Sequence, residues 1–204
     1  MTDDTTEQSS RPHHLRDPAP TAEAQAVFDD DIEDTGYVMN ASRLWAYQPA
    51  TMTGLFDLLH DTTQAGSLSL RQRSILVAAT ASTIRDSYCS LAWGSRLAKA
   101  ADAETAANVL RGDDNQLTAS EQAMARWARS IVNAPTTTTA VDIQTLRDVG
   151  FNDEQIFAMT VYVALRVAFS TVNASLGARP DSALRSTAPA AVLDAVTFGR
   201  AIED

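Results

Sequence analysis

Apolar residues recur every three or four positions along most of the chain, which is the spacing of one face of an α-helix. The stretch after Pro49 is typical: its apolar side chains fall at i, i+3, i+4 and i+7, at Met52, Leu55, Phe56 and Leu59. No segment has the strict alternation of a half-buried strand, and the Asn-Gly and Asp-Gly pairs of tight hairpins are absent. The pattern therefore predicts an all-α fold with roughly seven to nine helices.

Capping signals divide this pattern into separate helices. A Ser, Thr or Asn followed three residues later by Gln or Glu forms a capping box, in which each side chain bonds the other residue's backbone N–H. Such pairs predict helices that begin near residues 70, 119 and 153, after Ser69, Thr118 and Asn152. By the same rules, further helices are expected over 88–100, 103–111 and 141–149, with a last one starting at Pro189.

Length and composition set the domain organisation. A chain of 204 residues corresponds to one domain, which we assign to residues 26–204. Residues 1–25 are polar, acidic and interrupted by three prolines, and such a segment buries too little apolar surface to offset its ordering entropy. We therefore expect a disordered acidic tail over residues 1–25, with His13 and His14 exposed to solvent within it.

The charge balance narrows the range of partners. Sixteen basic and 26 acidic residues give a net charge of −10, whereas nucleic acids and anionic membranes are bound by clustered Lys and Arg. No nucleic-acid or membrane partner is expected. The chain shows neither the apolar core of a secretory signal nor a run of about 18–20 apolar residues, which favours a cytoplasmic location.

Cysteine and histidine are too scarce for most metal and redox centres. A single cysteine, Cys89, excludes an intrachain disulfide and suits a reducing compartment. The third histidine, His60, is expected on a solvated helix face, three residues after Asp57. We therefore expect no metal site and no cofactor.

One helix face carries the candidate chemistry. Asp86, Cys89, Trp93 and Arg96 are spaced by 3, 4 and 3 residues, which places them on the same face of the helix over 88–100. Cys89 lies in the first turn, where the helix dipole favours a thiolate, and Arg96 acts in the same direction. Asp86 opposes it because a neighbouring negative charge disfavours a second one. The residues alone leave the sign of the Cys89 pKa shift open, with an inert buried cysteine as the alternative.

Arg166 is the one charged residue in the apolar stretch 156–172. An unpaired charge in such surroundings is costly. We therefore expect Arg166 to meet Asp86, to bind a substrate carboxylate through two hydrogen bonds, or to lie in an interface between subunits. The apolar surface of this helix also predicts a homo-oligomer.

Residues 68–112 resemble the carboxymuconolactone decarboxylase and alkylhydroperoxidase D-like family, and the likeness extends over about 28–200. The family signature reads roughly Leu-Ser/Thr-x-Arg-x-Arg-Glu, then an apolar helix, then Cys-x-Tyr-Cys-x-x-x-His. Tyr88 and Cys89 match its tyrosine and second cysteine. Asp86 stands in place of its first cysteine, Trp93 in place of its histidine and Ser74 in place of its glutamate.

The resemblance implies a compact alkylhydroperoxidase D-like helical bundle that assembles as a dimer, trimer or hexamer. Its first functional implication is a peroxidase-related, thiol-based antioxidant enzyme that acts on a peroxide. Cys89 would be the reactive thiol, Asp86 or Tyr88 would handle protons, and Arg96 or Arg166 would give electrostatic support. With one cysteine the activity would be weak and would depend on an external thiol reductant.

Two further interpretations stand beside this one. A non-redox decarboxylase-like enzyme or small-molecule binder would take a small organic acid into the same pocket, lined by Ser74, Trp93, Arg96 and Arg166. The third is an oligomeric interaction protein whose catalytic relay has decayed. Replacement of Cys89 by serine separates the first interpretation from the second, because only thiol chemistry requires the sulfur.

Overall fold

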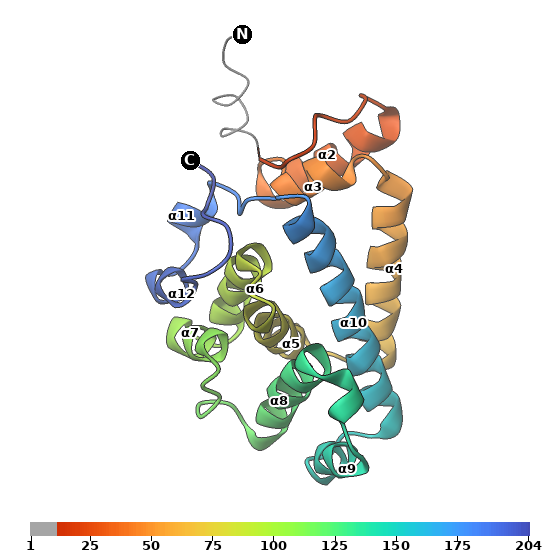
Figure 1. Ribbon diagram of the computed structural model, residues 1–204, viewed down its shortest axis with the longest axis vertical. Coiled ribbons are helices and arrows are strands. Elements are labelled where there is room, and N and C mark those ends of the chain that lie inside the picture. The colour runs from red at the N-terminus through yellow and green to blue at the C-terminus, as the bar shows by residue number, and fades with distance from the viewer. Residues whose placement is uncertain (1–11) are drawn as a thin grey trace.

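The computed structural model describes residues 12–204, and its regular structure there is entirely helical (Figure 1). These residues form eleven α-helices, of which eight have seven or more residues, which confirms the all-α prediction and its count of principal helices. A 3-10 turn at Pro135–Thr137 follows the seventh helix. The helices are α2 (Ala22–Thr35), α3 (Asn40–Trp45), α4 (Pro49–Ala65), α5 (Leu70–Thr83), α6 (Ser87–Ala100), α7 (Ala103–Arg111), α8 (Ala119–Asn133), α9 (Ala140–Asp148), α10 (Asp153–Ser175), α11 (Leu184–Thr187) and α12 (Ala190–Ala195).

Helix α5 forms the centre of the bundle. It packs on α6, α7, α8 and α10, and Figure 1 shows α5 and α6 between the α4–α10 pair on one side and α7 with α12 on the other. Because α5 has neighbours all around, its residues 75–79 are apolar on every side and fully buried. All three predicted capping boxes are present, at the starts of α5, α8 and α10.

The position of α6 depends on the turn before it and on one glycine. Arg85, in the turn after α5, has a left-handed backbone (φ 60°), and Asp86 then caps α6 by accepting a hydrogen bond from the backbone N–H of Cys89 (3.2 Å). Further along, a Cβ on Gly94 would lie 2.8 Å from Leu110 and 2.9 Å from Val192. Glycine at this position therefore lets α6 approach α7 and α12 closely.

Helix α10 is, among the described residues, the one helix with the length and apolar composition of a membrane span. The expectation from the sequence that no segment is long and apolar enough for a membrane span is therefore wrong for this helix. Within the bundle α10 packs against α4, α5 and α8, and its middle carries the buried Arg166. It is the long core helix of the fold.

Residues 12–25 differ from the expected disordered tail. The backbone N–H of His14 donates to the Leu176 carbonyl (2.9 Å), and the N–H of Arg179 donates to the Pro12 carbonyl (2.9 Å). His13 is 3% exposed, and α2 already begins at Ala22. Composition could not reveal this because the partners lie more than 150 residues away. The rest of the predicted tail, residues 1–11, lies outside the described part of the chain.

Candidate functional site

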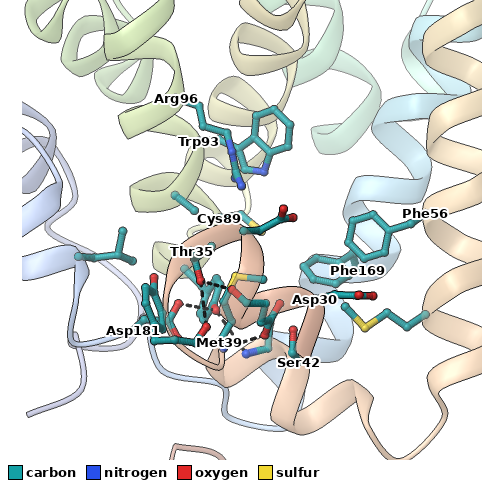
Figure 2. Close-up of a pocket in the computed structure, with 18 of the residues that line it drawn as sticks. Asp30, Thr35, Met39, Ser42, Phe56, Cys89, Trp93, Arg96, Phe169 and Asp181 are labelled. Carbon is teal, nitrogen blue, oxygen red and sulfur yellow. Dashed lines mark hydrogen bonds between the residues drawn. The ribbon is translucent and has the colours of Figure 1, made fainter. Parts of the chain in front are cut away.

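A cavity of about 690 Å³ lies among α2, α3, α4, α6 and α10, and we call it the central cavity. The first wall comes from α6, which contributes Cys89, Trp93 and Arg96. Figure 2 shows Arg96 and Trp93 at one end of the cavity, Cys89 between, and residues from α2 and α3 at the other end. The predicted spacing on α6 therefore brings these three side chains to one site.

Cys89 lies at the wall of the cavity but is only 1% exposed. Burial, together with the negative charge of Asp86, raises the pKa of its thiol to about 12, although Arg166 and the hydroxyl of Ser170 act to lower it. The structure thus answers the question that the residues left open, because burial outweighs the helix dipole and the nearby cations. At neutral pH Cys89 is a protonated thiol.

Arg166 reaches Cys89 from α10. Its Nη2 lies 3.6 Å from the Cys89 Sγ, and its guanidinium lies over the rings of Trp93 (4.9 Å) and Phe169 (5.1 Å). It is 4% exposed, its Nε has no hydrogen-bond partner, and within residues 12–204 it forms no ion pair. The pairing considered with Asp86 is therefore not formed.

Arg96 stands beside Arg166 as a second cation without a counterion. Its guanidinium carbon lies 4.8 Å from the centroid of the Trp93 ring, which Arg166 also contacts. Burial and the positive charge of Arg166 both lower the pKa of Arg96. Two guanidinium groups thus converge on one end of the central cavity, and no carboxylate of the described chain forms an ion pair with either.

Tyr88 and Asp181 form a buried pair at the cavity wall. The Tyr88 hydroxyl donates to Asp181 Oδ2 (2.6 Å), and the backbone N–H of Asn40 donates to Oδ1 of the same carboxylate (2.7 Å). Burial raises the pKa of Asp181 and, together with the Asp181 charge, raises the pKa of Tyr88 well above its usual range. The sequence analysis missed Asp181, since nothing near it in the chain links it to a tyrosine 93 residues earlier.

The end of the cavity opposite the arginines is acidic. Asp30 of α2 and Ser42 of α3 lie there (Figure 2), and Asp31 and Asp34 of α2 line the same cavity. Asp31 is buried and accepts a hydrogen bond from the backbone N–H of Met39 (2.8 Å), and burial raises its pKa. The fully buried Ser42 hydroxyl interacts with this carboxylate and lowers the Asp31 pKa, against the larger effect of burial.

Two of the predicted site residues do not line the central cavity. Ser74 is fully buried within α5, and its hydroxyl donates to the Leu70 carbonyl (2.8 Å) one turn earlier. Asp86 acts as the cap of α6, with its second carboxylate oxygen buried and unpartnered. The expectations that Ser74 lines the pocket and that Asp86 faces it are therefore not met, because both side chains are used within or beside their own helices.

The described residues hold no cluster of three or more His, Cys, Asp or Glu side chains placed to bind a metal ion. His60, at the exposed face of α4, is far from such a role, as its spacing from Asp57 predicted. The chemistry available in the central cavity is therefore that of a thiol, a tyrosine–carboxylate pair and two guanidinium groups.

Comparison with solved structures identifies the architecture. An alkylhydroperoxidase AhpD core structure, from an uncharacterized peroxidase-related protein of Ralstonia eutropha JMP134, is 21% identical over 84% of this chain and 94% of its own, with a TM-score of 0.74. A peroxidase-related protein from Silicibacter sp. TM1040 is 19% identical over 86% of this chain and 95% of its own, with a TM-score of 0.76.

A third similar structure is that of a debrominase. The debrominase Bmp8 is 14% identical over 89% of this chain and 97% of its own, with a TM-score of 0.69. A Bmp8 variant solved in complex with 2,3,4-tribromopyrrole has a TM-score of 0.68 at 15% identity. No family model matches the sequence, and no curated protein matches it. The structural similarities confirm that the chain has the alkylhydroperoxidase D-like fold.

Proposed function

We propose that this protein is a small-molecule enzyme that takes a small organic anion into the central cavity, with Arg166 holding the anionic group beside the Cys89 thiol. The observation that carries the proposal is the buried Arg166 guanidinium, which has no ion-pair partner in the described chain and faces the cavity. A buried charge without a partner is unfavourable, and a bound carboxylate would neutralise it through two charge-assisted hydrogen bonds.

The shape and surface of the cavity support a planar ligand. Trp93 and Phe169 present aromatic faces beside Arg166, and Phe56 meets the Phe169 ring edge-on at 5.6 Å. The similar fold of the debrominase Bmp8, solved with 2,3,4-tribromopyrrole, supports a small aromatic occupant. The volume of about 690 Å³ is in the usual range for small-molecule sites.

A binding experiment tests this proposal with three carboxylates of different shape: benzoate, cinnamate and adipate. We expect at least one to bind, as measured by calorimetry or ligand-observed NMR, and Arg166→Met to weaken that binding about 10- to 100-fold. Because the replacement removes an unpaired buried charge, the variant should remain at least as stable as the unmodified protein. Absence of binding by all three, or binding that is indifferent to Arg166→Met, contradicts the proposal.

A second candidate function is the thiol-based reduction of a peroxide, and the 3.6 Å contact between Arg166 and the Cys89 Sγ favours it. In this reaction the Cys89 thiol reduces ROOH to ROH and becomes a sulfenic acid. Two molecules of an external thiol then reduce the sulfenic acid back to the Cys89 thiol. They form a disulfide with each other, and the sulfenic oxygen leaves as water. The cytoplasm, which the single cysteine favours, would supply that thiol.

The burial of Cys89 favours anion binding over thiol chemistry. Thiol chemistry stood first in the sequence analysis, but the raised pKa of Cys89 leaves very little reactive thiolate at neutral pH. Treatment with peroxide and dimedone, followed by mass spectrometry, tests for the sulfenic acid, with Cys89→Ser as the control. No adduct at Cys89, beside a reacting control thiol, removes the peroxidase function. Carboxylate binding should survive Cys89→Ser, since Arg166 and not the sulfur holds the anion.

A further inference from the structure

The central cavity has opposite charges on different walls. Arg96 and Arg166 line it from α6 and α10, whereas Asp30, Asp31 and Asp34 line it from α2. None of these five side chains forms an ion pair within residues 12–204, although all of them line the same cavity. Opposite charges that share a cavity without pairing are held apart by its width, so each remains available to a ligand that spans it.

The acidic end contains more than surface carboxylates. Ser42 lines it with a fully buried hydroxyl that interacts with the Asp31 carboxylate, and Asp31 is itself buried there. Figure 2 shows Ser42 and Asp30 away from Arg96. Buried polar groups are almost always hydrogen-bonded, and the Asp31 carboxylate keeps acceptor sites that a ligand with several donors would fill.

We infer that the ligand of the central cavity is zwitterionic, with an anionic group on Arg166 and Arg96 and a protonated amine facing Asp30, Asp31, Asp34 and Ser42. An ammonium group offers three donors to these acceptors and matches their negative charge. The aromatic faces of Trp93 and Phe169 lie beside Arg166 and would contact the body of the molecule. This inference rests on the proposed function for its anionic end and adds the chemical class of the other end.

Three related probes test the inference: benzoate carries the anion alone, benzylamine the cation alone, and 4-(aminomethyl)benzoate both. We expect 4-(aminomethyl)benzoate to bind at least about 10-fold more tightly than benzoate, and benzylamine to bind most weakly of the three. The double variant Asp30→Asn/Asp34→Asn should reduce the ratio of the two dissociation constants to below about 3. Both positions are exposed on α2, so these replacements leave the core intact.

A matched control makes the same change of charge on the same helix. Asp29→Asn/Glu33→Gln alters two exposed α2 residues that do not line the cavity, and it should leave the ratio as in the unmodified protein. Suppose that benzoate binds through Arg166 but 4-(aminomethyl)benzoate binds no more tightly, or that its tighter binding persists in Asp30→Asn/Asp34→Asn. The inference of a zwitterionic ligand is then wrong, and the proposed function stands. If benzylamine binds more tightly than benzoate, or none of the probes binds, the zwitterion and its anionic anchor are both wrong.

Discussion

At the scale of single residues, the state of the Cys89 thiol depends on three neighbours and on burial. Asp86 both caps the helix at the Cys89 N–H and raises the pKa of the thiol by its negative charge. Arg166 and the Ser170 hydroxyl, both on α10, lower this pKa. The helix position of Cys89 follows from the sequence, but the dominant influence, desolvation, depends on everything packed around it.

We expect Asp86→Asn to increase the reactivity of Cys89. The asparagine oxygen can still accept the hydrogen bond from the Cys89 N–H, whereas the negative charge that disfavours the thiolate is removed. Alkylation by iodoacetamide at pH 9 should become about 3- to 10-fold faster. Asp102→Asn is the matched control, because Asp102 caps α7 in the same way through the Thr105 N–H (2.8 Å). An unchanged alkylation rate in Asp86→Asn would show that access and not charge limits the thiol.

The raised pKa of Cys89 also predicts that the free energy of unfolding depends on pH in the alkaline range. Its pKa is raised from 9.0 to about 12 in the folded chain, so above pH 9 the unfolded state loses a proton that the folded state keeps. The contribution of this group is therefore complete below pH 9 and is lost as the pH rises towards 12. Between pH 9 and 11 the free energy of unfolding should fall by up to about 1.4 kcal/mol per pH unit more than in Cys89→Ser. Urea unfolding measures this free energy at each pH. The same pH dependence in both proteins would contradict the prediction.

At the scale of helices, the elements and their boundaries follow largely from the sequence. Capping boxes and terminal glycines are local signals, and each predicted helix from α4 to α10 begins and ends within a few residues of its expected position. Helix α2 was missed because its buried face includes the charged Asp31, which interrupts the apolar spacing set by residues such as Ala24. A buried charged residue on the inner face thus hid the helix that carries it.

Two glycines predict opposite effects of the same substitution. Gly94→Ala places a Cβ 2.8 Å from Leu110 and 2.9 Å from Val192, so the contact of α6 with α7 and α12 must open, at a cost of about 1–3 kcal/mol. Gly54→Ala, on α4, meets no atom within 4 Å and should stabilise the helix by up to about 1 kcal/mol. Chemical denaturation of both variants measures the difference. Stabilisation by Gly94→Ala would show that α6 does not depend on this close approach.

At the scale of the whole molecule, the segment before α2 is attached to the segment that follows α10. His13 is buried, neither of its ring nitrogens has a hydrogen-bond partner among residues 12–204, and burial lowers its pKa. The neutral imidazole is therefore favoured in the folded state, and this contribution is present above pH 6.5 and lost as the pH falls. The protection factor of the Arg179 amide against hydrogen exchange, which reports its bond to the Pro12 carbonyl, should therefore fall on going from pH 7.5 to 5.

The non-titrating variant His13→Leu is the control for this prediction. Its protection factor at Arg179 should be the same at both pH values, because no buried group at position 13 gains a proton. An equal fall of the protection factor in both proteins would show that His13 does not control the attachment of this segment.

The homo-oligomer stays a prediction, which the exposed apolar residues of the described chain make specific. Phe157, on α10, is 71% exposed, and the helix that the sequence marked as too apolar for a small monomer carries it. We expect multi-angle light scattering to give a mass of at least twice 21.9 kDa. The charged variant Phe157→Lys should lower that mass, and a monodisperse monomer of the unmodified protein would remove the prediction.

Much of this protein can be read along the chain. Periodicity and caps act over three or four residues, so they predict the helices, the all-α fold and the common face of Cys89, Trp93 and Arg96 without knowledge of the rest. The site is different, because Arg166 meets Cys89 across 77 residues and Asp181 meets Tyr88 across 93. Burial, charge and the shape of a cavity are sums over neighbours that packing brings together. For that reason the protonation of the thiol, the unpaired arginines and the opposed charges emerge only once the helices are assembled.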